Sequence, residues 1–226
     1  MTPKPTQTAP ALSLPLTGSG STDDLALGTG AEGRFSLVVF FRGLHCPVCR
    51  KQLGELDRRL GDLREAGVGR VVAVSMETPE RSAQLVEEWH LDDLTVAHDL
   101  SEASAREWGL FVSTAIKDGE APVFNEPGVF VLDADGTVYW SNVSSMPFGR
   151  PALDDVLAGL QFAQQQDYPA RGVAQVKLPR CSGMRSACAG APLGSTLRSA
   201  GAWPSRSAHR LLGPRDPHRG RRGGHR

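Results

Sequence analysis

Two cysteines three positions apart are the residues of this sequence best suited to chemistry. Cys46 and Cys49 belong to a Cys-Pro-Val-Cys motif that follows an apolar run, residues 36–41, across a short turn. If a helix begins at Cys46, its unpaired backbone N–H groups and its dipole stabilise a thiolate there, so we expect Cys46 to be the nucleophile. Cys49 lies about one helical turn further on, within reach to form a disulfide after Cys46 reacts. The motif therefore predicts a thiol redox centre.

Two other uses of these cysteines have to be weighed against redox chemistry. Small apolar cysteines can simply pack beneath a helix, and four cysteines could together hold zinc. The remaining pair, Cys181 and Cys188, is separated by six residues, which is wider than the usual spacing of zinc ligands, so we expect neither a metal nor another cofactor. A Cys-Pro-x-Cys motif at a strand-to-helix turn favours redox use over packing.

The elements that position the motif follow an α/β pattern. Continuous apolar runs are typical of strands buried on both faces of a sheet, and leucines spaced by three and four residues indicate amphipathic helices. The predicted elements are a strand at 36–41, a helix from Cys46 to Gly67, a strand at 71–75, a helix from Thr78 to Trp89, a strand at 94–98, a helix at 101–108, a hairpin of 128–132 and 137–140, and a helix at 151–166. Together they predict a central mixed β-sheet flanked by helices.

Charge is divided unevenly along the chain. The totals balance at 25 basic and 25 acidic residues, but from Arg171 onward eleven Arg and one Lys face a single Asp, a balance of +11 that leaves −11 for residues 1–170. The stretch after Arg171 also lacks apolar periodicity, so it cannot bury enough apolar area to offset its ordering entropy. We expect an N-terminal segment at 1–33, with a hairpin of 12–16 and 25–27, a redox domain at 34–170 and a disordered basic tail at 171–226.

No targeting or membrane-spanning pattern is visible in the sequence. Prolines interrupt the first thirty residues, and no run approaches the roughly 18 apolar residues of a membrane span. We therefore expect a cytoplasmic protein without a membrane partner. Arginines of the tail could bind a nucleic-acid backbone in a salt-dependent way. The abrupt end of the domain pattern suits a shifted reading frame equally well, so nucleic acid is not the expected partner.

Residues 41–49, Phe-Arg-Gly-Leu-His-Cys-Pro-Val-Cys, resemble the Arg-Gly-x-x-Cys-Pro-x-Cys segment of the peroxiredoxin-like (AhpC/TSA, redoxin) branch of the thioredoxin superfamily. Residues 126–133 and 145–151 are similar to two further segments of that group, and the resemblance covers roughly residues 12–172. It implies a thioredoxin fold with an inserted segment and thiol-based reduction of hydroperoxides or disulfides. It also implies thioredoxin, glutaredoxin or glutathione as the electron donor, and it leaves a homodimer open.

Four further residues join the cysteines in the expected site. Pro127 stands where the thioredoxin fold has a cis-proline facing the active cysteine, and the resemblance favours a cis bond there. Arg150 is a candidate anchor for an anion or a peroxide, because its guanidinium is always charged. Arg42 and His45 add positive charge beside Cys46, and we expect them to bind substrate together with Pro127.

Two positions depart from the typical peroxiredoxin pattern. A Thr or Ser usually lies three residues before the peroxidatic cysteine and a Pro seven before it, where this chain has Gly43 and Val39. Because the missing hydroxyl normally helps to orient the peroxide, a thioredoxin-like disulfide reductase stays the close alternative to a hydroperoxide reductase. A redox-inert interaction module and a nucleic-acid-binding protein acting through the tail are more distant alternatives.

Overall fold

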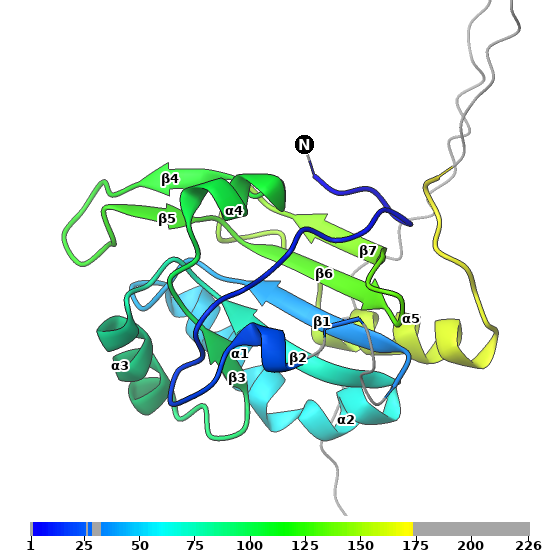
Figure 1. Ribbon diagram of the computed structural model, residues 1–226. Helices are drawn as coiled ribbons and strands as arrows, with labels where there is room; N and C mark the ends of the chain where they lie inside the picture. Colours follow the sequence, from blue (N-terminus) through cyan, green and yellow to red (C-terminus); the bar gives the residue numbers. More distant parts are fainter. Residues whose placement is uncertain (1, 26, 29–32, 174–226) are drawn as a thin grey trace, which may run out of the picture. The chain divides into compact units, whose positions relative to one another are not determined.

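A five-stranded mixed sheet forms the centre of the fold in the computed structural model (Figure 1). The structure describes residues 2–25, 27–28 and 33–173, which belong to a unit spanning residues 1–177. The elements are the 3-10 helix η1 (Thr22–Leu25), β1 (Phe35–Phe40), α1 (Pro47–Arg58), α2 (Leu60–Glu65), β2 (Val68–Val74), α3 (Pro79–Trp89), β3 (Thr95–Ala97), α4 (Glu102–Glu107), β4 (Val112–Thr114), β5 (Val123–Asn125), β6 (Gly128–Asp133), β7 (Val138–Val143) and α5 (Leu153–Gln165).

The strand order of the central sheet places β1 in its middle. The order is β3-β2-β1-β6-β7. β1 and β3 run parallel to β2, whereas β6 runs antiparallel to both β1 and β7. Every residue of β1 is buried, which explains why its sequence is a continuous apolar run rather than an alternating one. The strand that leads to the cysteines is thus paired along both edges and buried on both faces.

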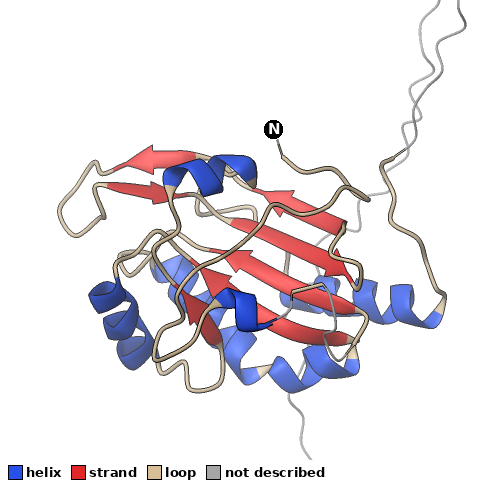
Figure 2. Ribbon diagram, in the orientation of Figure 1, coloured by secondary structure: helices blue, strands red, loops and turns tan. Residues whose placement is uncertain are grey.

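The two faces of the sheet carry different layers (Figure 2). Leu37 and Val39 of β1 pack into a core with α1, α2, α3 and α5, whereas Val38 and Phe40 pack into a second core with Trp108 and the N-terminal segment. The period of two along a strand sends successive side chains to opposite faces, so one strand contributes to both cores. Because α1 lies over β1, the start of this helix is fixed against the centre of the sheet.

The predicted fold class is confirmed, with three differences in detail. The long helix after Cys46 is interrupted at Arg59, whose backbone leaves the helical region (φ −113°, ψ 21°), so α1 and α2 are separate. The predicted N-terminal hairpin is wrong, because the chain turns back between Pro15 and Ser21 and then forms η1. The β4–β5 hairpin was not predicted, because strands of three residues carry too little pattern.

Two further expectations concern the C-terminal tail and a membrane-spanning segment. The predicted disordered tail lies outside the described residues, apart from 171–173. Within the described ranges, no helix is long and apolar enough to cross a membrane.

Candidate active site

Cys46 lies at the junction between β1 and α1, as the motif predicted. β1 ends at Phe40, five residues form a turn, and Cys46 is the N-cap residue of α1 with Pro47 in the first turn. The backbone N–H of Cys49 donates a hydrogen bond to Sγ of Cys46 over 3.3 Å. The sulfur therefore takes the place that a Ser or Asp oxygen has at an ordinary helix N-terminus, where a negative charge is stabilised.

The second cysteine lies beneath the first and contacts it directly. The thiol of Cys49 donates to Sγ of Cys46 over 2.6 Å, and both cysteines are free thiols. Cys46 is 1% exposed and Cys49 0% exposed. The two sulfurs are thus placed for disulfide formation, and neither is open to a large reactant in this conformation.

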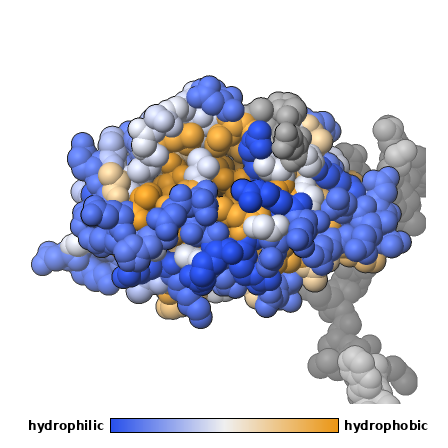
Figure 3. Space-filling model, turned by 90° about the horizontal axis from the view of Figure 1, so that it is seen from below, coloured by the Kyte–Doolittle hydropathy of each residue, from blue (hydrophilic) through white to orange (hydrophobic). Residues whose placement is uncertain are grey.

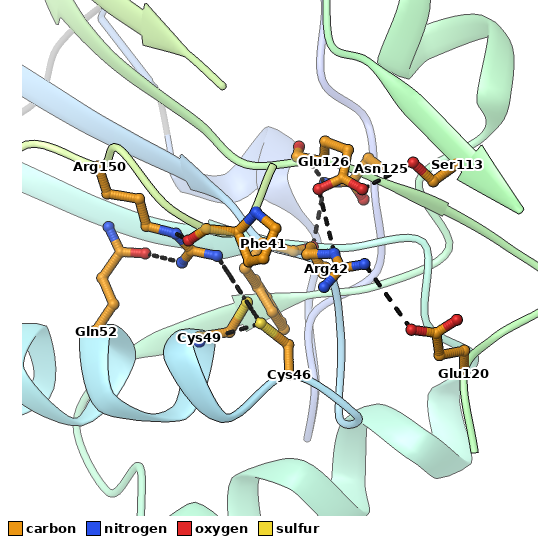
Figure 4. Close-up of polar contacts among 11 residues, drawn as sticks. Phe41, Arg42, Cys46, Cys49, Gln52, Ser113, Glu120, Asn125, Glu126 and Arg150 are labelled. Atoms are coloured by element: carbon orange, nitrogen blue, oxygen red, sulfur yellow. Dashed lines mark hydrogen bonds and ion pairs between the residues drawn. The ribbon is translucent and has the colours of Figure 1, made fainter. Parts of the chain in front are cut away.

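Arg150 reaches both sulfurs from the loop that precedes α5 (Figure 4). Its Nη2 lies 3.1 Å from Sγ of Cys49 and 3.9 Å from Sγ of Cys46. Two contacts fix the guanidinium: Nε donates to the carbonyl of Pro147 over 2.9 Å, and Nη1 donates to Oε1 of Gln52 in α1. Arg150, a predicted site residue, therefore belongs to the thiol site. Gln52, which the sequence did not suggest, fixes the position of its guanidinium.

The surroundings separate the acidities of the two thiols. The pKa of Cys46 is lowered to about 6, and the largest cause is the hydrogen bond from the Cys49 thiol. The hydrogen bond from the Cys49 N–H and the charges of Arg150 and Arg42 lower it further. Burial of the sulfur raises the pKa, but the lowering effects outweigh it. Burial, and then the bond donated to Cys46, raise the pKa of Cys49 well above its usual range. At neutral pH the site therefore combines a thiolate at Cys46 with a protonated Cys49.

Arg42 points away from the sulfurs toward two carboxylates (Figure 4). Its Nε lies 3.2 Å from Oε2 of Glu126 and its Nη2 3.9 Å from Oε1 of Glu120, while its guanidinium stacks 4.7 Å from the ring centre of Phe124. Arg42 still lowers the pKa of Cys46 through its charge. It is close to the site but is engaged by acids, which differs from the substrate-facing role expected from the sequence.

His45 does not supply the positive charge expected of it. Its ring lies 4.8 Å from that of Phe124, and both ring nitrogens are buried without a hydrogen-bond partner among the described residues. Burial, followed by the charge of Arg42, lowers the pKa of His45. An imidazole whose nitrogens are buried beside a cation loses its proton readily, so the ring is neutral at neutral pH. The positive charges that act on Cys46 are those of Arg150 and Arg42.

The cis bond expected at Pro127 is not found. No cis peptide bond occurs among the described residues, so the peptide bond before Pro127 is trans. The neighbouring backbone is already held in an extended path. The N–H of Glu126 donates to the carbonyl of Phe111 over 2.8 Å, and the carbonyl of Glu126 accepts from Nδ2 of Asn125 over 3.2 Å. The chain enters β6 directly from this path, so the ordinary trans preference prevails.

Two polar residues near the motif had no signal in the sequence. Glu77, only 2% exposed, accepts a hydrogen bond over 2.8 Å from the N–H of Leu44, next to Gly43 in the turn before Cys46. Asn125 donates to the carbonyl of Phe41 over 3.1 Å and ties the end of β1 to β5. Both contacts join segments far apart in the chain, so spacing could not reveal them.

A small cavity adjoins the thiol site. It measures about 150 Å³ and is lined by Arg150, by the polar side chains of Gln52, Lys51 and Glu55 from α1, and by apolar residues of β1, α1, β6 and α5. Seen from below in the sense of Figure 1, the surface carries apolar residues in its middle and polar residues around them (Figure 3). Among the described residues, no group of three or more His, Cys, Asp or Glu is arranged to hold a metal ion.

Fold and site together define a thioredoxin-fold protein with a paired-thiol centre at a helix N-terminus. A profile of the AhpC/TSA family matches residues 5–141, more than half of the 226-residue chain, so the chain belongs to this family. It is thereby a peroxiredoxin-like thiol oxidoreductase, in the class of thiol peroxidases and thiol–disulfide oxidoreductases. No curated protein matches the chain significantly.

Similar solved structures agree with this assignment of the fold. Peroxiredoxin 6 of Arenicola marina matches with a TM-score of 0.60 at 15% identity, over 73% of this chain and 75% of its own. Prx3 of Vibrio vulnificus in complex with H2O2 matches with a TM-score of 0.57 at 18% identity, over 69% and 97% of the two chains. Peroxidoxin BcpB of Mycobacterium tuberculosis matches with a TM-score of 0.56 at 18% identity, over 71% and 97%. At these identities the likeness concerns the fold alone.

Proposed function

We propose that this protein reduces hydroperoxides through a Cys46 thiolate and resolves the product with Cys49. The observation that carries the proposal is the guanidinium of Arg150 against both sulfurs, 3.1 Å from Cys49 and 3.9 Å from Cys46, at a helix N-terminus. A positive charge here stabilises the attacking thiolate. It also stabilises the negative charge that develops on the leaving oxygen when an O–O bond breaks.

The reaction balances with the two thiols and one external reductant. The Cys46 thiolate attacks the terminal oxygen of ROOH, the O–O bond breaks, and the alkoxide takes a proton to leave as ROH, with a sulfenic acid on Cys46. The Cys49 thiol then attacks this sulfur, so that a disulfide forms and water leaves. An external dithiol, or two molecules of glutathione, reduces the disulfide and restores the thiols of Cys46 and Cys49. We propose thioredoxin, glutaredoxin or glutathione for this last step.

The burial of the sulfurs favours a small substrate over a protein disulfide. Cys46 is 1% exposed, and a thiolate that attacks a disulfide needs room for the incoming S–S bond in line with its sulfur. A hydroperoxide needs far less room, and the 150 Å³ cavity beside Arg150 offers space for a small organic substituent. The Vibrio vulnificus structure, described as a complex with H2O2, has the same fold. These points support peroxide as the substrate.

Gly43 favours a second candidate, a disulfide reductase. Typical peroxiredoxins carry a hydroxyl at this position to orient the peroxide, and glycine cannot supply one. A dithiol with a lowered pKa on its N-terminal sulfur is also the chemistry of a reductase.

One variant separates the two functions. In Cys49→Ser, a peroxidase accumulates a sulfenic acid on Cys46 that a dimedone reagent traps, whereas a reductase accumulates a mixed disulfide with its substrate. Intact-protein mass spectrometry distinguishes these adducts, and Cys46→Ser is the control that should form neither. The peroxidase proposal fails if Cys49→Ser reacts with peroxide no faster than an unactivated thiol while forming a long-lived adduct with a protein disulfide.

A further inference from the structure

A buried carboxylate stands behind the turn that carries Cys46. Glu77 follows β2, and its side chain is 1% exposed. Oε1 accepts from the N–H of Leu44 over 2.8 Å, and Arg81 donates to the carboxylate from Nε over 2.5 Å and from Nη2 over 3.2 Å. A buried carboxylate is retained only with such partners. One of them is the backbone of the active-site turn.

The same carboxylate closes the space beside Gly43. The φ of Gly43 is +123°, a region that side-chain-bearing residues rarely adopt. A β-carbon at this position would lie 2.8 Å from Cδ of Glu77 and would overlap its Oε1. Because Arg81 and Leu44 hold the carboxylate, it cannot swing away without losing buried hydrogen bonds.

The turn passes this constraint on to Cys46. The carbonyl of Gly43 accepts a hydrogen bond over 3.1 Å from the N–H of Cys46. Glu77 is itself anchored, since its own carbonyl accepts from the N–H of Asp99 over 2.9 Å. A continuous path of hydrogen bonds thus runs from the β2–α3 junction through the turn to the N-cap of α1.

We propose that Glu77 is a positioning residue for Cys46: its carboxylate holds the turn at Gly43 and Leu44 in the shape that places the sulfur at the start of α1. The proposal rests on Cys46 being the reactive thiol, as in the proposed function. It also explains the glycine in this turn, because a Thr or Ser at position 43 and the carboxylate of Glu77 would need the same space.

Three substitutions of Glu77 test the proposal, each with a different loss. Glu77→Ala removes the acceptor of the Leu44 N–H and the partner of Arg81. Glu77→Gln keeps an acceptor at the same reach but loses the charge, whereas Glu77→Asp keeps the charge and withdraws the acceptor from the turn. Glu102→Ala is the matched control, because Glu102 and Arg106 form an exposed pair with the same i,i+4 spacing on α4.

The decisive readout is the pH profile of Cys46 alkylation, recorded by mass spectrometry, together with the second-order rate with hydrogen peroxide. Because a displacement of about 1 Å at a reacting group can cost about 100-fold in rate, we expect Glu77→Ala to lose at least about tenfold in peroxide rate. Its alkylation midpoint should rise above the wild-type value, since the sulfur loses its place at the N-cap. Glu77→Gln should restore most of both, and Glu102→Ala should change neither.

The cycle with position 43 adds a test of shared space. Gly43→Ala should lower the alkylation rate strongly in the wild-type background. Beside Glu77→Ala or Glu77→Asp the overlap is relieved and only the unfavourable φ of +123° remains, so the loss should be smaller. The proposal is overturned if folded Glu77→Ala keeps the wild-type midpoint and rate, or if the effects of Gly43→Ala are additive with those of both variants. If Glu77→Ala does not fold, the other two variants decide. A wild-type alkylation profile in Glu77→Asp overturns the proposal. A raised alkylation midpoint in Glu77→Asp, together with a midpoint near the wild-type value in Glu77→Gln, supports it. Alkylation needs no peroxide, so these outcomes stand apart from a failure of the peroxidase proposal.

Discussion

Removing the thiol of Cys49 should make Cys46 a weaker acid, although Cys49 lies beneath the reactive sulfur and carries no charge. The Cys49 thiol donates to Sγ of Cys46 over 2.6 Å, and this bond is the largest cause that lowers the pKa of Cys46 to about 6. Cys49→Ala deletes this donor and leaves the backbone N–H, 3.3 Å from the sulfur, in place. The substitution therefore isolates the side-chain hydrogen bond.

The size of the effect follows from the strength of a hydrogen bond to a charged acceptor. Such a bond contributes about 1.5–3 kcal/mol, and 1.36 kcal/mol corresponds to about one pKa unit, so the pKa of Cys46 should rise by about 1–2 units. Without its 3.1 Å contact to Cys49, the guanidinium of Arg150 can turn toward Cys46 and stabilise the thiolate. We therefore expect the rise in the pKa of Cys46 to lie near the lower end of this range. At pH 7 the thiolate share of Cys46 would fall from about 90% to between about 10% and about 50%.

The rate of iodoacetamide labelling of Cys46 as a function of pH measures this change. Cys49→Ser is the matched variant, because its hydroxyl keeps a donor at the same position and should give a smaller rise. A midpoint in Cys49→Ala equal to or below that of the wild type would refute the reasoning, since it would show that the neighbouring thiol does not set the acidity of Cys46.

Three further predictions concern the guanidinium, the pH dependence of stability and the tail. Arg150→Met should lower the peroxide rate about 100-fold, as expected for loss of a charge that stabilises a developing anion, and Gln52→Ala, which only frees the guanidinium, should fall between this variant and the wild type. The lowered pKa of Cys46 should make reduced protein more stable as pH rises from about 6 to about 9, by up to about 1.4 kcal/mol per pH unit, because the unfolded thiol still binds its proton there. Truncation after Gly172 should leave the melting temperature and thiol activity nearly unchanged.

Each of these has a measurement that can contradict it. Stopped-flow peroxide kinetics would contradict the first if Arg150→Met matched the wild type. Urea unfolding of the reduced protein at several pH values tests the second: the stabilisation is lost as pH falls through about 6, and Cys46→Ser should lack this slope. A slope shared by both proteins would assign it to other groups. For the truncated chain, a large loss of melting temperature or activity would show that residues beyond Gly172 support the domain.

The sequence was informative about the elements with the strongest local pattern. β1 and the start of α1 follow from a continuous apolar run and from a proline in a first helical turn, and both place Cys46 as expected. Two further predicted helices begin at Thr78 and Ser101, and both residues cap their helices by accepting from the N–H groups of Arg81 and Ser104. These features depend on neighbours within a few positions, which a single sequence displays directly.

The rest of the site depends on contacts between distant segments. Gln52 meets Arg150 across 98 positions, and Glu77 meets Leu44 across 33. Neither spacing leaves a periodic trace, so composition and pattern could not suggest them. The predicted charge on His45 was wrong for a related reason, because burial among residues of other segments lowers its pKa.

The glycine before the motif has a different meaning once Glu77 is in view. From the sequence, Gly43 is a missing hydroxyl, but the carboxylate of Glu77 occupies the space that a side chain there would need. In the described part of the chain, the donors to Sγ of Cys46 are the N–H and thiol of Cys49 and the guanidinium of Arg150. Both groups of Cys49 serve the thiolate, so a bound peroxide would depend on Arg150 for its orientation. Restoring the hydroxyl by Gly43→Thr should therefore slow the reaction of Cys46 with peroxide rather than speed it. The threonine side chain would need the space of the Glu77 carboxylate and would displace it from the turn.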